Sequence, residues 1–125
     1  PHAARIQLTA AAPLIVTTDT HLLGLMLRNL LDNALKYSPP ESVVTVSVSQ
    51  SSHAWQIAVR NRVGRIGFPD AERLFAKFYR SPLALRHSGM GLGLYWVRGM
   101  ARRMAGDVVY QRDQDDVVFT LCLPI

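Results

Sequence analysis

The sequence predicts an α+β fold: a two-layer α/β sandwich with a mixed, mostly antiparallel sheet and helices on one face. Two observations support this. Two segments carry apolar residues at helical spacing, and several shorter segments alternate apolar and polar residues as half-buried strands do. The order along the chain is strands, helix, hairpin, long loop, helix, hairpin. The 125 residues suit one core, so we expect a single domain over residues 1–125.

The first half of the chain supplies two strands, a long helix and a hairpin. The stretches "RIQLTA" (5–10) and "APLIVTT" (12–18) both have the composition of strands. Thr18 or Asp19 then supplies the N-cap of a helix that reaches Tyr37, where the following "SPP" ends it. The next two alternating segments, 42–50 and 54–61, are predicted to pair as a hairpin.

The second half begins with a long loop over residues 62–91, within which "DAERLFAKFYR" (70–80) is a short amphipathic segment. A second helix is expected over residues 92–105, with Gly106 as the C′ residue, the position that commonly takes the left-handed conformation. "DVVYQ" and "DVVFTLCLP" then close the chain as a hairpin around "RDQDD".

Composition excludes several classes of protein. Hydrophobic residues make up 49% and charged residues 18%, which indicates a globular chain and not a disordered one. No apolar run approaches the roughly 20 residues of a membrane-spanning helix. The net charge is +5, but the arginines are scattered without a basic run, which argues against nucleic-acid binding. A single cysteine excludes an internal disulfide and fits a reducing compartment.

The first helix carries polar residues beside its apolar face. Asn29, Asn33 and Lys36 follow i, i+4, i+7 spacing and therefore share one side of the helix. Two carboxamides followed by an amine suit a Mg²⁺–phosphate group, because Mg²⁺ prefers hard oxygen ligands. The same two asparagines could instead bridge neighbouring backbone groups, and this row of residues alone does not separate the two interpretations.

A glycine-rich stretch, "HSGMGLGLYWV" (87–97), precedes the second helix. Gly89, Gly91 and Gly93 alternate there, and glycines let a backbone approach phosphates closely. The free N–H groups of a helix N-terminus attract anions. The stretch lacks the GK[ST] of a Walker loop. Combined with the Asn29–Asn33–Lys36 row, it predicts a nucleotide site.

Together these segments resemble the ATP-binding catalytic domain of sensor histidine kinases, within the GHKL ATPase superfamily. "NLLDNALKYS" is similar to the family's N box, "LFAKFYRS" to its F box and "GMGLGL" to its G2 box. The resemblance implies a Bergerat-type fold that binds ATP and Mg²⁺ under a lid at about residues 80–88. The function it implies is transfer of the γ-phosphate of ATP to a histidine.

The resemblance also assigns roles to individual residues. Asn33 resembles the Mg²⁺ ligand and Asn29 the first N-box asparagine, while Lys36 would lie near the phosphates and Tyr37 near the base or ribose. Phe75 and Phe78 resemble the F-box aromatics. The implied catalytic residues are Asn29, Asn33, Lys36 and Arg86. The implied ATP-binding residues are Asn29, Asn33, Lys36, Tyr37, Asn61, Gly64, Ile66, Gly67, Phe78, Arg80, Gly89, Met90, Gly91, Leu92, Gly93 and Leu94.

Hydrolytic members of the superfamily carry a glutamate at the position of Asn29. An asparagine cannot accept a proton, so we expect phosphoryl transfer to an outside nucleophile and not hydrolysis. The resemblance implies that this nucleophile is a histidine on a separate dimerisation domain, which we expect to be absent from this chain. It also implies a response regulator downstream and a cytoplasmic location within a membrane-anchored bacterial sensor kinase.

The stretch "NRVGRIGFPD" (61–70) departs from the family's G1 box, D-x-G-x-G-I. Asn61 stands in place of the aspartate that accepts from the adenine amino group, and Val63 and Arg65 replace the two glycines. We therefore expect weak ATP affinity and reduced base selectivity, with Gly64 and Gly67 taking the unusual backbone conformations. These substitutions favour an alternative function, a regulatory or interaction module of the same fold that binds nucleotide weakly or not at all. An ATP hydrolase and a serine kinase of anti-sigma type are further alternatives.

Overall fold

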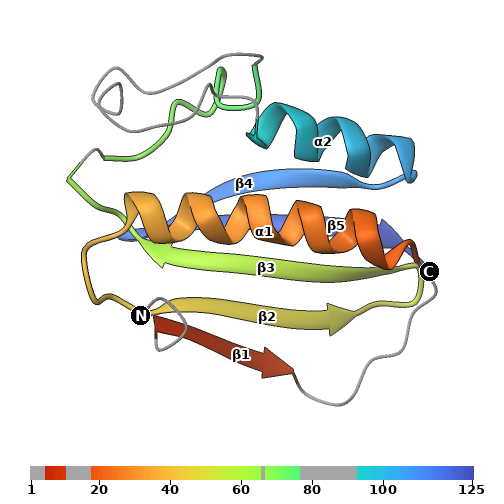
Figure 1. The fold of residues 1–125 in the computed structure, drawn as a ribbon, viewed down its shortest axis with the longest axis horizontal. Coiled ribbons are helices and arrows are strands. Elements are labelled where there is room, and N and C mark those ends of the chain that lie inside the picture. The colour runs from red at the N-terminus through yellow and green to blue at the C-terminus, as the bar shows by residue number, and fades with distance from the viewer. Residues whose placement is uncertain (1–4, 11–17, 66, 77–92) are drawn as a thin grey trace.

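The computed structural model describes residues 5–10, 18–65, 67–76 and 93–125. The described strands form one sheet in the order β1-β2-β3-β5-β4, in which β1 and β2 are parallel and the other neighbours antiparallel. Both helices lie on the same face of this sheet (Figure 1), so the predicted fold class is confirmed. The elements are β1 (Ile6–Ala10), α1 (Thr20–Tyr37), β2 (Val44–Gln50), β3 (Ala54–Arg62), α2 (Gly93–Arg103), β4 (Asp107–Asp113) and β5 (Asp116–Pro124).

The helix α1 begins and ends where the sequence predicts. The Asp19 carboxylate accepts from the backbone N–H groups of His21 and Leu22, at 3.0 and 3.1 Å, which satisfies two free donors of the first turn. Ser38 is the C-cap, and the prolines after it prevent a further turn. The buried face of α1 packs on the sheet. The core formed there contains Met26, Leu30, Ala34, Val44, Val46, Trp55, Ile57, Val59, Leu74, Val97, Ala101, Val108, Val117, Phe119, Leu121 and Leu123.

Both predicted hairpins form, with small differences at their ends. β2 starts at Val44, two residues later than expected, and the hydroxyl of Ser51 bonds with the backbone of Ala54 across the β2–β3 turn. The β4–β5 turn has two residues, of which Gln114 adopts a φ of 55°. Most of the strand expected over residues 12–18 lies outside the described residues. The amphipathic segment from residue 70 forms turns, and not a helix, as far as residue 76.

Arg5 fastens the first strand to the turn between α1 and β2. Its guanidinium donates to the Ser38 hydroxyl at 2.7 Å, to the Pro39 carbonyl at 3.0 Å and to the Ser42 carbonyl at 2.9 Å. Ser38 is only 8% exposed, so one of these bonds satisfies a buried hydroxyl. Arg5 therefore holds the C-terminal end of α1 in place, and no local pattern in the sequence indicates this.

The C-terminal end of α2 differs from the expectation for Gly106. Gly106 donates its N–H to the Ala101 carbonyl and Ala105 donates to Arg102, which is the pattern of a Schellman motif. In this motif Ala105 is the residue in the left-handed conformation, with a φ of 65°. A Cβ at Gly106 would collide with the Cys122 carbonyl. Gly106 is therefore required for its close approach to β5, and the left-handed position falls on an alanine.

We predict that Ala105→Gly stabilises the protein by about 0.5–1 kcal/mol, because glycine adopts the left-handed conformation without the steric cost that alanine bears. Urea unfolding measures this change, and Gly106→Ala serves as the matched opposite. That variant should destabilise the protein by about 1–3 kcal/mol, because its Cβ meets a backbone carbonyl. Equal or reversed effects of the two substitutions would contradict this assignment of the motif.

Candidate functional site

Asn29, the first residue of the predicted polar row on α1, faces the N-terminal end of α2. The Asn29 Nδ2 donates to the Leu25 carbonyl at 2.9 Å, and because a carbonyl only accepts, the NH₂ group must be the one that faces it. The Oδ1 points toward Gly93, where a Cβ would lie 3.1 Å from it. Asn29 thus bridges backbone with its NH₂ group and presents its oxygen to the end of the glycine-rich stretch. The structure brings together these two predicted parts of the site.

The remaining residues of the row follow one and two turns later on α1. Asn33 is half-buried and its side chain makes no hydrogen bond with any described residue, so its carboxamide oxygen is available as an acceptor. Lys36 is exposed and Tyr37 is half-buried at the last turn of the helix. The apolar face of α1 is fixed by Met26, Leu30 and Ala34, which are at most 3% exposed, and this burial sets the direction of the row.

Asn61 lies at the end of β3 with its side chain on the face of the sheet that the helices cover. It is 5% exposed, and it continues the buried alternation of Trp55, Ile57 and Val59 along the strand. Its Nδ2 donates to the Arg62 carbonyl at 2.8 Å. This bond fixes the orientation of the amide and leaves the Oδ1 available to accept from a ligand.

The loop after Asn61 rests on the end of α1. A Cβ on Gly64 would overlap the Tyr37 carbonyl, so only glycine allows this approach. Gly67 donates to the Gly64 carbonyl at 3.1 Å and adopts a φ of +88°. The expectation of unusual conformations at both glycines is confirmed for Gly67 and wrong for Gly64, which has no positive φ and is instead required for its contact with α1.

The segment over residues 63–76 is anchored by contacts that sequence reasoning missed. The N–H of Val63 donates to the Asp115 carbonyl at 2.7 Å, and the Arg112 guanidinium carbon lies 3.8 Å from the centroid of the Phe68 ring. Leu74 is 2% exposed. The one signal in the sequence that Phe68 makes a packing contact is that it is an apolar residue in a polar loop. No residue near Arg112 in the sequence indicates that Arg112 contacts Phe68.

Phe75, the predicted F-box aromatic, joins this segment to the sheet and to α2. Its ring packs edge-on against Phe119, with centroids 6.2 Å apart, and the Arg98 guanidinium carbon lies 4.5 Å from its centroid. Arg98 also contacts the Asp107 carboxylate at 3.3 Å. Burial raises the pKa of Asp107, but the Val108 N–H and the charges of Arg98 and Arg102 outweigh it and hold the pKa below its usual value. Phe75 therefore packs as a structural aromatic between this segment, β5 and α2.

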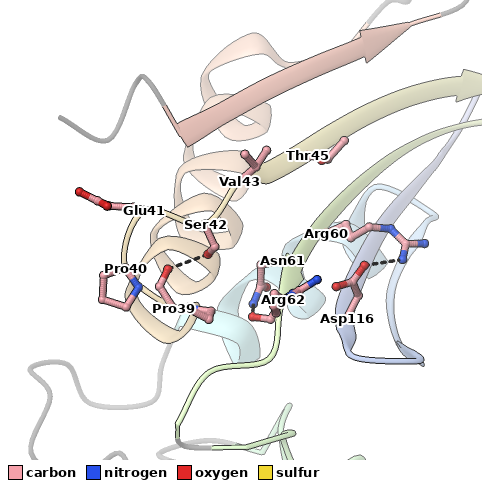
Figure 2. Close-up of a pocket in the computed structure, with 10 residues that line it drawn as sticks. All are labelled: Pro39, Pro40, Glu41, Ser42, Val43, Thr45, Arg60, Asn61, Arg62 and Asp116. Carbon is pink, nitrogen blue, oxygen red and sulfur yellow. Dashed lines mark hydrogen bonds and ion pairs between the residues drawn. The ribbon is translucent and has the colours of Figure 1, made fainter.

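A cavity of about 600 Å³ lies between the α1–β2 turn and the end of β3 (Figure 2). Among the predicted site residues that the structure describes, Asn61 alone lines it. Arg60 turns toward Asp116, whose carboxylate it contacts at 3.0 Å, and the carboxylates of Asp116 and Asp113 raise its pKa. None of Asn29, Asn33 and Lys36 lines this cavity, so it is not the space beside the polar row on α1.

Part of the predicted site lies outside the described residues. Leu94, a predicted ATP-binding residue that the structure does describe, is partly buried against the core. Among the described residues, no group of three or more His, Cys, Asp or Glu side chains could hold a metal ion. The predicted residues outside the description are Ile66, Phe78, Arg80, Arg86, Gly89, Met90, Gly91 and Leu92.

The sequence pattern of the histidine kinase-, DNA gyrase B- and HSP90-like ATPases matches residues 18–125. The sensor-like histidine kinase SenX3 of Mycobacterium tuberculosis is 36% identical over 95% of this chain, which spans 30% of that protein. The swarming motility regulation sensor protein RssA of Serratia marcescens is 32% identical over 95% of the chain, which spans 26% of it. The chain thus covers less than a third of either relative.

Solved structures show the same fold. The mycobacterial sensor histidine kinase MprB aligns with a TM-score of 0.81 and 27% identity, over 98% of this chain and 87% of that one. The catalytic domain of the histidine kinase ThkA aligns with a TM-score of 0.78 at 21% identity, over 98% of this chain and 82% of that one.

We predict that Gly64→Ala destabilises the protein by about 1–3 kcal/mol, because the new methyl group meets the Tyr37 carbonyl at the rigid end of α1. Urea unfolding provides the measurement. Gly24→Ala is the matched control: Gly24 is an exposed position within α1 with open space around it, so alanine there should stabilise by about 0.5–1 kcal/mol. A neutral Gly64→Ala would show that the loop does not rest on α1.

Proposed function

Because this chain belongs to the family of histidine kinase-, DNA gyrase B- and HSP90-like ATPases, we propose that it positions Mg²⁺–ATP for transfer of the γ-phosphate to a histidine. Its sequence and fold are those of the catalytic ATP-binding domain of sensor histidine kinases. We place the phosphates beside the Asn29–Asn33–Lys36 row and the base at the loop from Asn61 to Gly67.

The row on α1 fits a metal that arrives with the nucleotide. Mg²⁺ in nucleotide sites is commonly held by one or two protein oxygens, phosphate oxygens and water. The Asn33 carboxamide supplies one such oxygen, and it makes no hydrogen bond with the described residues that would compete. When bound, the ion would neutralise charge on the phosphates. Lys36 and the lid arginines, Arg80 or Arg86, would add positive charge at the same end.

The chemistry of Asn29 supports phosphoryl transfer over hydrolysis, and this is the observation that carries the proposal. Its NH₂ group is bonded to the Leu25 carbonyl, and its oxygen faces the start of α2. A carboxamide cannot take a proton from water, so this position supplies no general base. The residues present can bind and orient the nucleotide, and the accepting nucleophile has to come from elsewhere.

The fixed amide of Asn61 favours adenine over guanine. One N–H of its NH₂ group is bonded to the Arg62 carbonyl, and this bond holds the amide with its Oδ1 available to accept. The adenine amino group donates, whereas guanine has a carbonyl oxygen at the same ring position. A neutral amide makes a weaker bond than a carboxylate, which supports the expectation of low affinity. Asn61 can thus still accept a hydrogen bond from the adenine amino group, but this bond is weaker than the one an aspartate would make.

We further propose that the accepting histidine lies on a dimerisation domain of the same protein, and that a response regulator receives the phosphoryl group. Relatives named as sensor kinases are three to four times longer than the match, which leaves room for such domains. A cytoplasmic location follows from the same proposal. In the part of the chain that the structure describes, no helix is long and apolar enough to cross a membrane.

The alternative is a regulatory module of the same fold that does not use nucleotide. The replacement of the G1 aspartate and glycines by Asn61, Val63 and Arg65 favours it. The anchored loop and the available asparagine oxygens favour the kinase. Formation of phosphohistidine from ATP separates the two, because the alternative requires none.

We predict that calorimetry in the presence of Mg²⁺ detects weak binding of ATP, in the high micromolar range or weaker, and weaker binding of GTP. Asn61→Asp should tighten ATP by about fivefold, because a charged acceptor adds about 1 kcal/mol to the hydrogen bond. Low-micromolar affinity in the wild type, or equal affinities for ATP and GTP, would contradict this account of Asn61.

We predict that the full-length protein forms phosphohistidine from labelled ATP, and that Asn33→Ala reduces the rate by about a hundredfold, because charge stabilisation at the phosphates is lost. Asp32→Ala is the matched control, since Asp32 is the exposed neighbour on the same helix and should leave the rate unchanged. Absence of phosphohistidine in a folded wild-type protein would refute the kinase, and an unaffected Asn33→Ala would remove Asn33 from the site.

A further inference from the structure

The β4–β5 hairpin holds the loop at the base end of the site, although it lies far from that loop in the sequence. The loop over residues 63–68 is fixed at three points. Val63 donates to the carbonyl of Asp115 in the hairpin turn, Gly64 rests on the Tyr37 carbonyl, and Phe68 lies under the guanidinium of Arg112. Two of the three contacts therefore come from one hairpin.

The contact between Arg112 and Phe68 is the one made by side chains alone. The guanidinium carbon lies 3.8 Å from the ring centroid, well within the range of a cation–π interaction. Phe68 is half-buried and packs on the core, while Arg112 is exposed and forms the outer layer of the stack. Along β4, Arg112 continues the side of Val108 and Tyr110, which face the core, so its strand position directs it toward the loop.

The position of this stack matters because the loop lacks the family's glycines. Val63 and Arg65 carry side chains where backbone freedom is expected, and Gly67 alone among the described glycines has a positive φ. Phe68 follows Gly67 directly, so the stack fixes the loop just after the residue with the left-handed conformation. Asn61, at the other end of the loop, is fixed by its bond to the Arg62 carbonyl.

We propose that Arg112 is a positioning residue for the base end of the nucleotide site. By covering Phe68 it holds the loop over residues 63–68 in the conformation that receives the base, and it thereby sets the affinity for the adenosine part of the ligand. This inference rests on the proposed function of the chain. It adds a residue from the β4–β5 hairpin to a site otherwise built from α1, the loop after β3 and the start of α2.

The experiment measures dissociation constants of adenosine and of Mg²⁺–ADP by NMR titration of the 125-residue chain. Arg112→Ala should raise both constants by about two- to fivefold, the change that loss of an exposed cation–π contact predicts. Adenosine is uncharged, so a weaker affinity for it cannot come from the lost positive charge. Backbone amides of residues 63–68 should also exchange hydrogen faster in the variant.

Two controls and a double variant make the test specific. Arg103→Ala removes an equally exposed charge on α2, and Gln111→Ala alters the adjacent exposed residue of β4, so neither should change adenosine binding. Phe68→Leu should weaken adenosine to a similar degree. The double variant Arg112→Ala/Phe68→Leu should be no weaker than the worse single variant, because both remove the same contact. Thermal unfolding confirms that each variant folds. Arg112→Lys, which keeps the positive charge, is measured beside Arg112→Ala as a smaller change of the same side chain.

The outcomes separate this inference from the proposed function. A wild-type chain that binds neither Mg²⁺–ADP nor adenosine refutes the nucleotide site and the role of Arg112 with it. A wild-type chain that binds both, beside an Arg112→Ala variant that binds adenosine equally well, refutes the role of Arg112 alone. Weaker Mg²⁺–ADP with unchanged adenosine would assign Arg112 a charge effect and equally refute its positioning role.

Discussion

The burial of one face of α1 against the sheet is the constraint on which the site depends. Met26, Leu30 and Ala34 are almost completely buried, so the helix cannot rotate about its axis without exposing apolar surface or opening cavities that cost several kcal/mol. Because side-chain directions repeat every 3.6 residues, burial of the apolar face of α1 also fixes the direction of the polar face beside it. The direction of the Asn29–Asn33–Lys36 row, with Asn29 toward the start of α2, is therefore a consequence of packing, before any ligand is present.

The loop after β3 is held by contacts that do not depend on glycines at positions 63 and 65. Glycines normally supply backbone freedom and close approach, and here the two functions fall on different residues. Gly64 supplies the close approach to the Tyr37 carbonyl, and Gly67 supplies the positive φ. The hairpin contacts at Val63 and Phe68 then restrict the loop from the other side. Arg5 holds the turn that follows Tyr37 at the C-terminal end of α1. That end of α1 is therefore a rigid surface for the loop after β3.

The sequence was sufficient to predict the elements because their signals are local. Helical spacing, the Asp19 cap, the prolines after Ser38 and the alternation in the strands each depend on a few adjacent residues. The polar row on α1 was predictable for the same reason. The contacts of Arg5 and Arg112 were not, because each joins segments far apart in the chain and an arginine in a strand is ordinary in composition. The assignment of Gly106 was wrong because a Schellman motif normally places glycine one residue earlier, at the position of Ala105.

The distribution of charge among the predicted residues explains how such a site could function with two asparagines where relatives can carry acids. Asn29 and Asn61 offer neutral oxygens, and neither can be protonated or act as a base. Both have their NH₂ groups bonded to carbonyls of the backbone, at Leu25 and Arg62, so the orientation of each oxygen is set in advance. Preorganised neutral acceptors bind more weakly than carboxylates but need no counter-ion when the ligand is absent. In this arrangement the negative charge belongs to the nucleotide and the protein supplies orientation, which favours transfer to an outside nucleophile over attack by water.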